Sequence, residues 1–179
     1  MNKKVLVIST SLRRGGNSER LADSFAEGAK ESGNQVEKVE LSAKNIHFCL
    51  GCLRCLEAGR CVIRDDADLI VQKMRTAEVL VFATPIYYYG MSGQMKTLLD
   101  RANPLYQSDY SFREIYLLSA AAEDSPEVDA NAITSLNGWI SCFERAKLAG
   151  VLCAGGVDVV GAIAGHPALR RAYEMGLSV

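Results

Sequence analysis

KKVLVISTSLRRGGNSERL, residues 3–21, joins a short apolar run to an amphipathic segment through a polar loop. The run is nearly continuous in valine, isoleucine and leucine, which indicates a strand buried on both faces. Beyond the loop, apolar side chains return at helical spacing at Leu21, Phe25 and Ala29. Gly33 then provides a stop signal for the helix. A doubly buried strand that leads directly into a helix is typical of a parallel α/β sheet.

The same alternation of strand and helix continues along the chain. Apolar or alternating runs predict further strands over residues 35–41, 78–85, 113–122 and 150–156. Amphipathic runs predict helices over residues 65–77, 92–102 and 166–176, and a helical segment from residue 129 to the turn before the last strand. The predicted fold class is therefore a doubly wound, five-stranded parallel sheet in a three-layer α/β/α sandwich. No internal repeat or linker divides the chain, so residues 1–179 are expected to form a single domain.

Composition narrows the classes of partner and of cellular location. The chain has 179 residues and a formal net charge of −1, so it carries no electrostatic footprint for nucleic acid or for an anionic membrane surface. No apolar run approaches the roughly 20 residues of a membrane-spanning helix. The first residues have too short an apolar run for a signal peptide. We therefore expect a cytoplasmic protein with reduced thiols, which disfavours disulfides.

In an open parallel sheet the ligand binds beyond the carboxyl ends of the strands, so the loops there are the candidate site. The loop after the first strand is rich in hydroxyl, amide and guanidinium groups and runs into a helix, a combination that can hold phosphate. Its polar residues are Ser9, Thr10, Ser11, Arg13, Arg14, Asn17 and Ser18. It contains neither the G-x-G-x-x-G pattern nor the G-K-[ST] pattern of nucleotide loops. The alternative is a polar surface loop in which Asn17 or Ser18 only caps the helix.

The loop after the third predicted strand presents aromatic side chains at the same edge. Ile86, Tyr87, Tyr88, Tyr89 and Gly90 follow the Thr84-Pro85 pair. Rings with polar tips form a good wall for a flat heterocycle. The alternatives are an extension of the strand or a dimer contact. At the end of the next helix, Asp100 and Arg101 are interpreted as a surface or interface ion pair.

Three segments, taken in order and spacing, resemble the NAD(P)H-dependent FMN reductase and iron–sulfur flavoprotein family of the flavodoxin-like superfamily. They are VISTSLRRGGNSERLA (7–22), FCLGCLRCLEAGRCVIRDDAD (48–68) and VFATPIYYYGMSGQMKTLLDR (81–101). The resemblance implies a flavodoxin-like fold and bound FMN. It implies phosphate contacts from Ser9, Ser11, Arg13, Asn17 and Ser18, and contacts to the isoalloxazine ring from Pro85, Ile86, Tyr87, Tyr88 and Gly90. A third contact loop is expected around residues 120–125.

Cys49, Cys52, Cys55 and Cys61 form the compact pattern C-x2-C-x2-C-x5-C. This spacing suits a [4Fe–4S] cluster, whose ligands are thiolates, better than the two separated pairs common in structural zinc sites. The iron–sulfur flavoproteins share the compact spacing. The alternatives are structural or redox-active free thiols, and zinc.

The remaining candidates for chemistry are interpreted as structural. Cys142 and Cys153 are expected in the core. His47 and His166 are assigned no chemistry, and Asp65 with Asp66 is expected to cap and charge the start of a helix.

A flavin itself supplies the reactive atom, which explains why the sequence shows no convincing catalytic triad or paired carboxylates. The expected function is an FMN-dependent oxidoreductase in which NAD(P)H is a transient co-substrate and a quinone, a flavin or a similar small molecule is the acceptor. Tyr87 and Tyr88 are the first candidates for shaping the flavin face, and no residue is named as a catalytic acid or base. Two rival hypotheses are an iron–sulfur electron carrier serving ferredoxin-like proteins, and a flavodoxin-like scaffold with a zinc or thiol interaction module. A homodimer or homotetramer is expected, because the resemblance implies a flavin site closed by a neighbouring chain.

Overall fold

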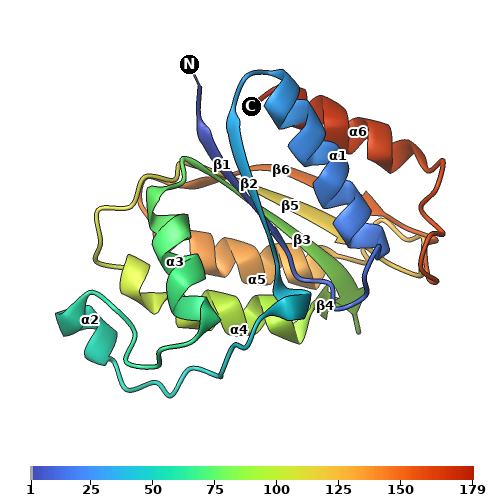
Figure 1. Cartoon of the computed structure of the whole chain (residues 1–179). Helices are drawn as coiled ribbons and strands as arrows, with labels where there is room; N and C mark the ends of the chain where they lie inside the picture. Colours follow the sequence, from blue (N-terminus) through green and yellow to red (C-terminus); the bar gives the residue numbers. More distant parts are fainter. Residues whose placement is uncertain (1) are drawn as a thin grey trace.

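The computed structural model describes residues 2–179 and contains a parallel sheet between two layers of helices (Figure 1). The sheet has the order β2-β1-β3-β5-β6, and every pairing along it is parallel. Its strands are β1 (Lys4–Ser9), β2 (Gln35–Glu40), β3 (Val79–Tyr87), β5 (Glu114–Ala120) and β6 (Lys147–Ala154). A two-residue strand, β4 (Gly90–Met91), pairs antiparallel with the end of β3. The doubly wound, flavodoxin-like fold is confirmed, with six strands in place of the five predicted.

The helices divide between the two faces of the sheet (Figure 1). They are α1 (Asn17–Glu31), α2 (Arg54–Ala58), α3 (Asp66–Thr76), α4 (Gly93–Arg101), α5 (Ala130–Ile140) and α6 (Pro167–Leu177), with short 3-10 turns at Leu41–Ala43 and Asn103–Leu105. Helices α1 and α6 lie side by side over one face, and α3, α4 and α5 cover the other. Buried strand side chains alternate between the two resulting cores, which is why the strands read as continuous apolar runs in the sequence.

Helices α1 and α6 approach each other through two glycines. A β-carbon on Gly28 would lie 2.1 Å from the carbonyl oxygen of Tyr173, and one on Gly176 would lie 2.1 Å from the carbonyl oxygen of Phe25. The backbones therefore touch where any larger side chain would hold them apart. This contact fixes the position of α1, whose first turn faces the candidate site.

The strand order reverses between β1 and β3. From β1 the chain passes outward to β2 and then returns to β3 on the other side of β1. Ser9 at the end of β1 is in register with Ala83 of β3, so the last residues of β3 extend beyond the point where the loop after β1 begins. This reversal is the position at which open α/β sheets bind ligands.

Three expectations about individual elements are corrected. The last strand begins at Lys147, before the expected Gly150. Cys142 is exposed, whereas Cys153 is partly buried as part of β6. Arg101 is only 1% exposed and pairs with Asp65, so the expected surface ion pair with Asp100 is wrong.

Within residues 2–179 we find no helix that combines the length and the apolar character needed to cross a membrane.

Candidate functional site

A cavity of about 150 Å³ opens at the carboxyl edge of the sheet, beside the reversal of strand order. Its walls come from the loop after β1 and the first turn of α1, the ends of β3 and β5, and the loops after β5 and β6: Ser11, Arg13, Gly16, Asn17, Ser18, Pro85, Ile86, Tyr87, Ala120, Ala122, Val157, Asp158 and Val160. Most residues expected at the phosphate and at the ring therefore line one cavity. Ser9, Tyr88 and Gly90 were also expected there but do not line it.

The loop after β1 is folded tightly around its own polar groups. The Arg13 N–H donates to Ser11 Oγ over 3.1 Å, and Ser11 Oγ donates to the Arg13 carbonyl over 3.2 Å. A β-carbon on Gly16 would meet Ser11 Oγ at 2.7 Å and the Arg13 carbonyl oxygen at 2.9 Å, so only glycine fits there. Gly16 is also the N-cap of α1 and brings no side chain to the first helical N–H groups. The helix thus presents unfilled backbone donors and the positive end of its dipole to the cavity.

Two buried hydroxyl groups in this region lack partners. Ser18 is 2% exposed and Ser9 is fully buried, and within the described chain neither Oγ has a hydrogen-bond partner. Buried polar atoms are rarely left unsatisfied, because each costs about 1–3 kcal/mol. Ser18 also lines the cavity, so one of the residues in its wall carries an unsatisfied hydroxyl group. These observations fit an anionic group such as the phosphate of FMN.

Asn17 ties α1 to the loop between β6 and α6. Its Nδ2 donates to the carbonyls of Val157 and Val159 over 3.2 and 3.0 Å, and its Oδ1 accepts from the Ile163 N–H over 3.3 Å. The side chain is therefore occupied by the protein, and what Asn17 offers a ligand is its backbone N–H. Arg13 Nη1 similarly donates to the Asp158 carbonyl over 3.0 Å, which leaves its other donors for a ligand.

Hydroxyl groups that the sequence analysis did not assign join the loops after β1 and β3. Thr10 Oγ1 donates to the Ala83 carbonyl over 3.0 Å and lies 2.9 Å from Ser92 Oγ. The Ser92 N–H donates to Thr84 Oγ1 over 3.0 Å, and Ser92 Oγ accepts from the Met95 N–H to cap α4. A serine directly before the helical run of α4 is a recognisable N-cap signal. No local pattern signals the link to Thr10, because it joins residues far apart in the chain.

The three tyrosines form the turn between β3 and β4. Tyr87 ends β3, while Tyr88 and Tyr89 adopt positive φ angles of 49° and 62°. Tyr88 is fully exposed, and Tyr89 Oη donates to Glu123 over 2.8 Å. This hydrogen bond raises the pKa of the Tyr89 hydroxyl and ties the turn to the loop after β5. The expected strand extension is thus real up to Tyr87.

The loop after β5 contributes small side chains, Ala120 and Ala122, to the cavity. Beneath it, Ser119 Oγ donates to Asp129 over 2.8 Å, and both side chains are buried. The third contact loop expected around residues 120–125 therefore lies at the cavity, without polar side chains in its wall.

The four clustered cysteines line a second cavity, of about 270 Å³, next to the end of α4. Cys49 and Cys52 are exposed, and Cys55 and Cys61 are partly buried. Asn103 Nδ2 donates to Cys55 Sγ over 3.0 Å, and the Gly51 N–H donates to Cys49 Sγ over 3.4 Å. Among residues 2–179, however, no three His, Cys, Asp or Glu side chains are already gathered as a metal site. The donor set suits a thiophilic metal group, which would require the thiols to close around it.

Buried charges lie at the base of this second cavity. Burial by itself lowers the pKa of Arg101, but the ion pair with Asp65 and the nearby Cys61 thiol raise it above its usual value. Burial alone would raise the pKa of Asp65, but Arg101 and the His47 N–H hold it well below its ordinary range. Asp65 also accepts from the Ala67 N–H, which confirms its role as the cap of α3. His166 caps α6 by accepting from the Ala168 N–H, and the exposed His47 ring lies 3.1 Å from Asp65.

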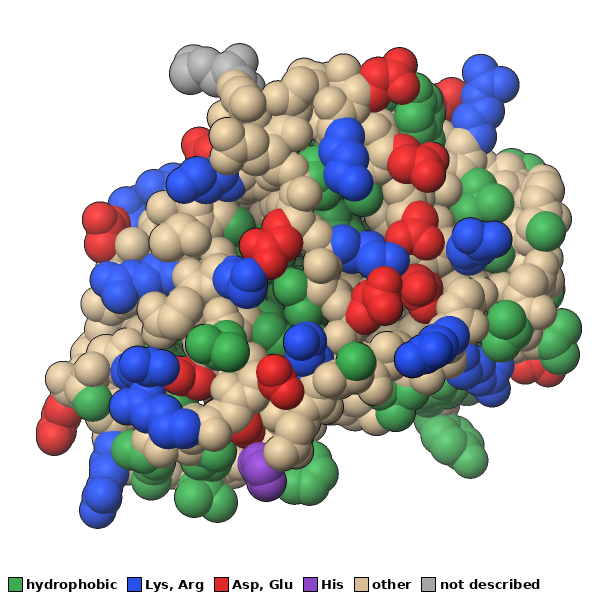
Figure 2. Space-filling view, viewed as in Figure 1, with side chains coloured by type: hydrophobic (Ala, Val, Ile, Leu, Met, Phe, Trp, Pro, Cys, Tyr) green, Lys and Arg blue, Asp and Glu red, His purple; other side chains and the backbone are tan. Residues whose placement is uncertain are grey.

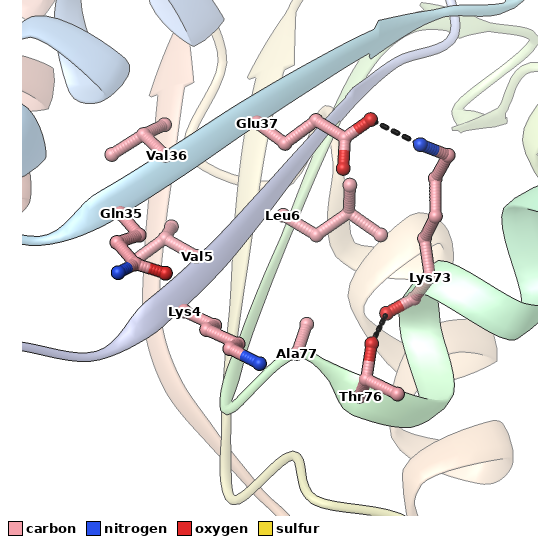
Figure 3. A pocket seen from close by; sticks show the side chains of 9 residues that line it. All are labelled: Lys4, Val5, Leu6, Gln35, Val36, Glu37, Lys73, Thr76 and Ala77. Carbon is pink, nitrogen blue, oxygen red and sulfur yellow. Dashed lines mark hydrogen bonds and ion pairs between the residues drawn. The ribbon is translucent and has the colours of Figure 1, made fainter.

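A third cavity, of about 320 Å³, lies near the amino ends of β1 and β2, away from these sites (Figure 3). Glu37 and Lys73 form an ion pair at one side of it, and Lys4 lies on another (Figure 3). Its position is opposite to the ligand edge of an α/β sheet. It is therefore not the candidate site.

Comparison with known proteins finds related sequences for much of the chain. A family model described as NADPH-dependent FMN reductase matches residues 3–140. An iron-sulfur flavoprotein of Archaeoglobus fulgidus is 39% identical over 101 residues, which are 56% of this chain and 46% of the relative. An iron-sulfur flavoprotein of Methanocaldococcus jannaschii is 39% identical over 102 residues, 57% of this chain and 53% of the relative. The chain thus spans about half the length of these curated relatives.

Solved structures with the same fold match along the whole chain. The NAD(P)H:quinone oxidoreductase from Methanothermobacter marburgensis superposes with a TM-score of 0.75, covering 99% of this chain and 98% of that one. Its sequence identity is 18%, so this likeness bears on the fold alone.

Proposed function

The chain belongs to the NADPH-dependent FMN reductase family, and on that premise we propose that it is an FMN-dependent oxidoreductase. It takes reducing equivalents from NADH or NADPH and passes them to a small acceptor such as a quinone or a free flavin. The observation that carries the proposal is the cavity at the strand reversal, which is lined by the first turn of α1, including Ser18 with its unpaired hydroxyl.

The phosphate of FMN is assigned to the loop after β1. Backbone N–H groups of the first turn of α1, the Ser18 hydroxyl and the free donors of Arg13 supply hydrogen bonds and positive charge there. Gly16 allows the phosphate to approach the backbone closely. Ser9 remains part of this assignment through its unpaired hydroxyl, and Ser11 acts by holding the loop in shape.

The ring of the flavin is assigned to the mouth of the cavity. At about 150 Å³ the cavity is smaller than the roughly 300–1,000 Å³ typical of ligand pockets, so it cannot enclose a whole flavin. The ring would lie against Pro85, Ile86 and Tyr87, with the other face open to the nicotinamide and the acceptor in turn. A bound flavin accepts hydride from NAD(P)H and passes the electrons on, while these side chains orient the ring and exclude water.

The Tyr88–Tyr89 turn suggests how the side of the flavin site that this chain leaves open to solvent is closed. Tyr88 is fully exposed in a backbone conformation that L-residues rarely adopt. We assign Tyr88 and Gly90 to the wall that a second copy of the chain closes, in a homodimer or homotetramer. All six cysteines are free, which suits a cytoplasmic location.

Steady-state kinetics tests the proposal. The FMN-loaded protein is mixed with NADH or NADPH, with and without a soluble quinone, and oxidation of the nicotinamide is followed. We expect continued turnover that depends on the acceptor and is lost when FMN is removed. An FMN-loaded protein that oxidises neither nucleotide would refute the enzymatic proposal.

A second candidate function is supported by the four cysteines around one cavity. In this alternative Cys49, Cys52, Cys55 and Cys61 hold a [4Fe–4S] cluster, and the protein exchanges electrons with a ferredoxin-like partner. Two curated relatives bear the name iron-sulfur flavoprotein. Iron and acid-labile sulfide are measured in protein purified without oxygen, with a Cys52→Ser variant as control. Absence of both from the wild-type protein would refute this candidate and leave the reductase proposal intact.

A further inference from the structure

Arg101 holds together the two ends of the cysteine segment, which comprises residues 47–63. Its side chain is fully buried at the end of α4. Nη1 donates to the His47 carbonyl over 2.7 Å, and Nη2 donates to the Ile63 carbonyl over 3.1 Å. His47 precedes the first clustered cysteine and Ile63 follows the last. One guanidinium group thus bridges the backbone on both sides of the segment.

Asp65 completes this arrangement. Its carboxylate binds Arg101 in a bidentate pair, with distances of 2.7 and 2.8 Å, and accepts the His47 N–H over 2.9 Å. Both backbone groups of His47 are therefore held by the ion pair. The planar fork of arginine makes two parallel hydrogen bonds to a carboxylate while still reaching two carbonyls, which a lysine ammonium cannot do.

The segment between these anchors has little to hold it in shape. Gly51, Leu53 and Gly59 adopt positive φ angles, and Phe48, Leu50 and Leu53 are mostly exposed. Figure 2 shows hydrophobic side chains gathered along the lower edge of the molecule, where Figure 1 draws α2. Helix α2 has five residues, and none of them is buried. The order of the segment must therefore come largely from its ends.

A second group of charges, formed by Arg60, Arg64 and Asp68, supports the later part of the segment. Arg60 donates from Nε to both carboxylate oxygens of Asp68, over 3.0 and 2.8 Å, and Arg64 Nη1 donates to the same carboxylate over 3.3 Å. Asp68 is 4% exposed on α3. Asp68 holds the segment only through the side chain of Arg60. Arg101, in contrast, contacts the backbone at both ends of the segment and lines the same cavity as the four thiols.

We propose that Arg101, held by Asp65, is a positioning residue: it fixes the two ends of the cysteine segment, so that the four thiols can close around a thiophilic metal group as one donor set. The identity of the metal group as a [4Fe–4S] cluster rests on the second candidate function. Whether the four thiols act together as metal ligands can be tested without iron. Mutation of a group that orients metal ligands from outside the coordination sphere typically lowers the metal affinity about 10-fold to 100-fold. The same range is expected for Arg101.

Co²⁺ alone is the probe, because tetrahedral coordination by thiolates gives it a distinct charge-transfer absorption. The full-length, reduced protein without FMN is titrated as wild type, Arg101→Met, Arg101→Lys and Cys52→Ser. Leu98→Ala is the matched control, since Leu98 is a fully buried core residue of the same helix and does not line the cysteine cavity. Amide hydrogen exchange of residues 47–63 is measured on each variant, and Asp65→Asn replaces Arg101→Met if the latter does not fold.

The expected result is a loss of Co²⁺ affinity of about 10-fold to 100-fold in Arg101→Met, with faster exchange over residues 47–63. Arg101→Lys should not restore affinity, and Leu98→Ala should keep it. Wild-type affinity in Arg101→Met, an equal loss in Leu98→Ala, or no thiolate-bound Co²⁺ in the wild type would each overturn the inference. Thiolate-bound Co²⁺ in a protein that contains no iron or sulfide when purified without oxygen would refute the [4Fe–4S] cluster and would still support the positioning role of Arg101.

Discussion

Replacing Gly28 by alanine should destabilise the protein, although alanine is the better helix former. On an exposed helical surface the exchange would gain up to about 1 kcal/mol. At Gly28 the new β-carbon would lie 2.1 Å from the Tyr173 carbonyl oxygen and 2.9 Å from the Leu177 nitrogen. A carbon–oxygen contact normally needs about 3.3 Å, so α6 must move by roughly 1 Å.

The clash should outweigh the gain in helix propensity. Overpacking costs about 1–3 kcal/mol, and the upper end applies because the obstructing atoms belong to the backbone and cannot rotate away. The net loss for Gly28→Ala is then about 2 kcal/mol. Gly138 in α5 is the matched control, since no atom lies within 4 Å of its would-be β-carbon. Gly138→Ala should gain up to about 1 kcal/mol.

Urea unfolding of the two variants measures this difference. The midpoint should fall for Gly28→Ala and rise for Gly138→Ala, with unchanged slopes. If Gly28→Ala stabilised the protein as much as Gly138→Ala, the tight approach of α1 and α6 would be wrong.

Three further predictions concern the two cavities. Ser18→Ala should weaken FMN binding about tenfold without loss of stability, because it removes a hydroxyl that has no partner in the chain and is assigned to the proposed phosphate site; equilibrium titration with FMN measures this, with the exposed Ser135→Ala as control. Asn17→Ala should lower the free energy of unfolding by about 2 kcal/mol, because the buried Val157 carbonyl, the part-buried Val159 carbonyl and the Ile163 N–H lose their partner; a loss below about 0.5 kcal/mol, within the range of ordinary surface substitutions, would contradict the role assigned to it. Since the folded-state pKa of Asp65 is depressed, its stabilising effect is present above the ordinary carboxyl pKa and is lost as the pH falls towards the folded value. Unfolding free energies measured from about pH 5 downwards should therefore decline less steeply in Asp65→Asn than in the wild type.

Most of the fold was predictable because its three central strands, β1, β3 and β5, are buried on both faces. Short, apolar, valine-rich runs such as Lys4–Ser9 are typical of buried strands, and the runs of β1 and β5 are each followed by a helical pattern. The short strand β4 was missed because its turn is made by Tyr88 and Tyr89 at positive φ, where glycine or asparagine would be the usual signal. Cys142 follows apolar neighbours at helical spacing, but it lies beyond the end of α5, where the chain turns to solvent.

The candidate site was predictable where its residues end a strand or lie in the loop and first helical turn that follow one. Ser11, Ser18 and Tyr87 all reach the cavity because carboxyl ends of parallel strands share one edge. The ion pair of Arg101 with Asp65 was not predictable, because its partners lie 36 residues apart and only the packed chain brings them together. The neighbouring Asp100 offered a local partner that the structure does not use, since Asp100 binds Lys96.

The central claim is that the cavity at the strand reversal binds FMN. The most direct measurement is the absorption spectrum of protein purified without oxygen, compared with an FMN titration of the protein after flavin removal. The account predicts flavin bands with FMN and chain in equal amounts, and recovery of those amounts on titration with the wild type. A protein that carries no flavin and takes up none in the titration would contradict the account.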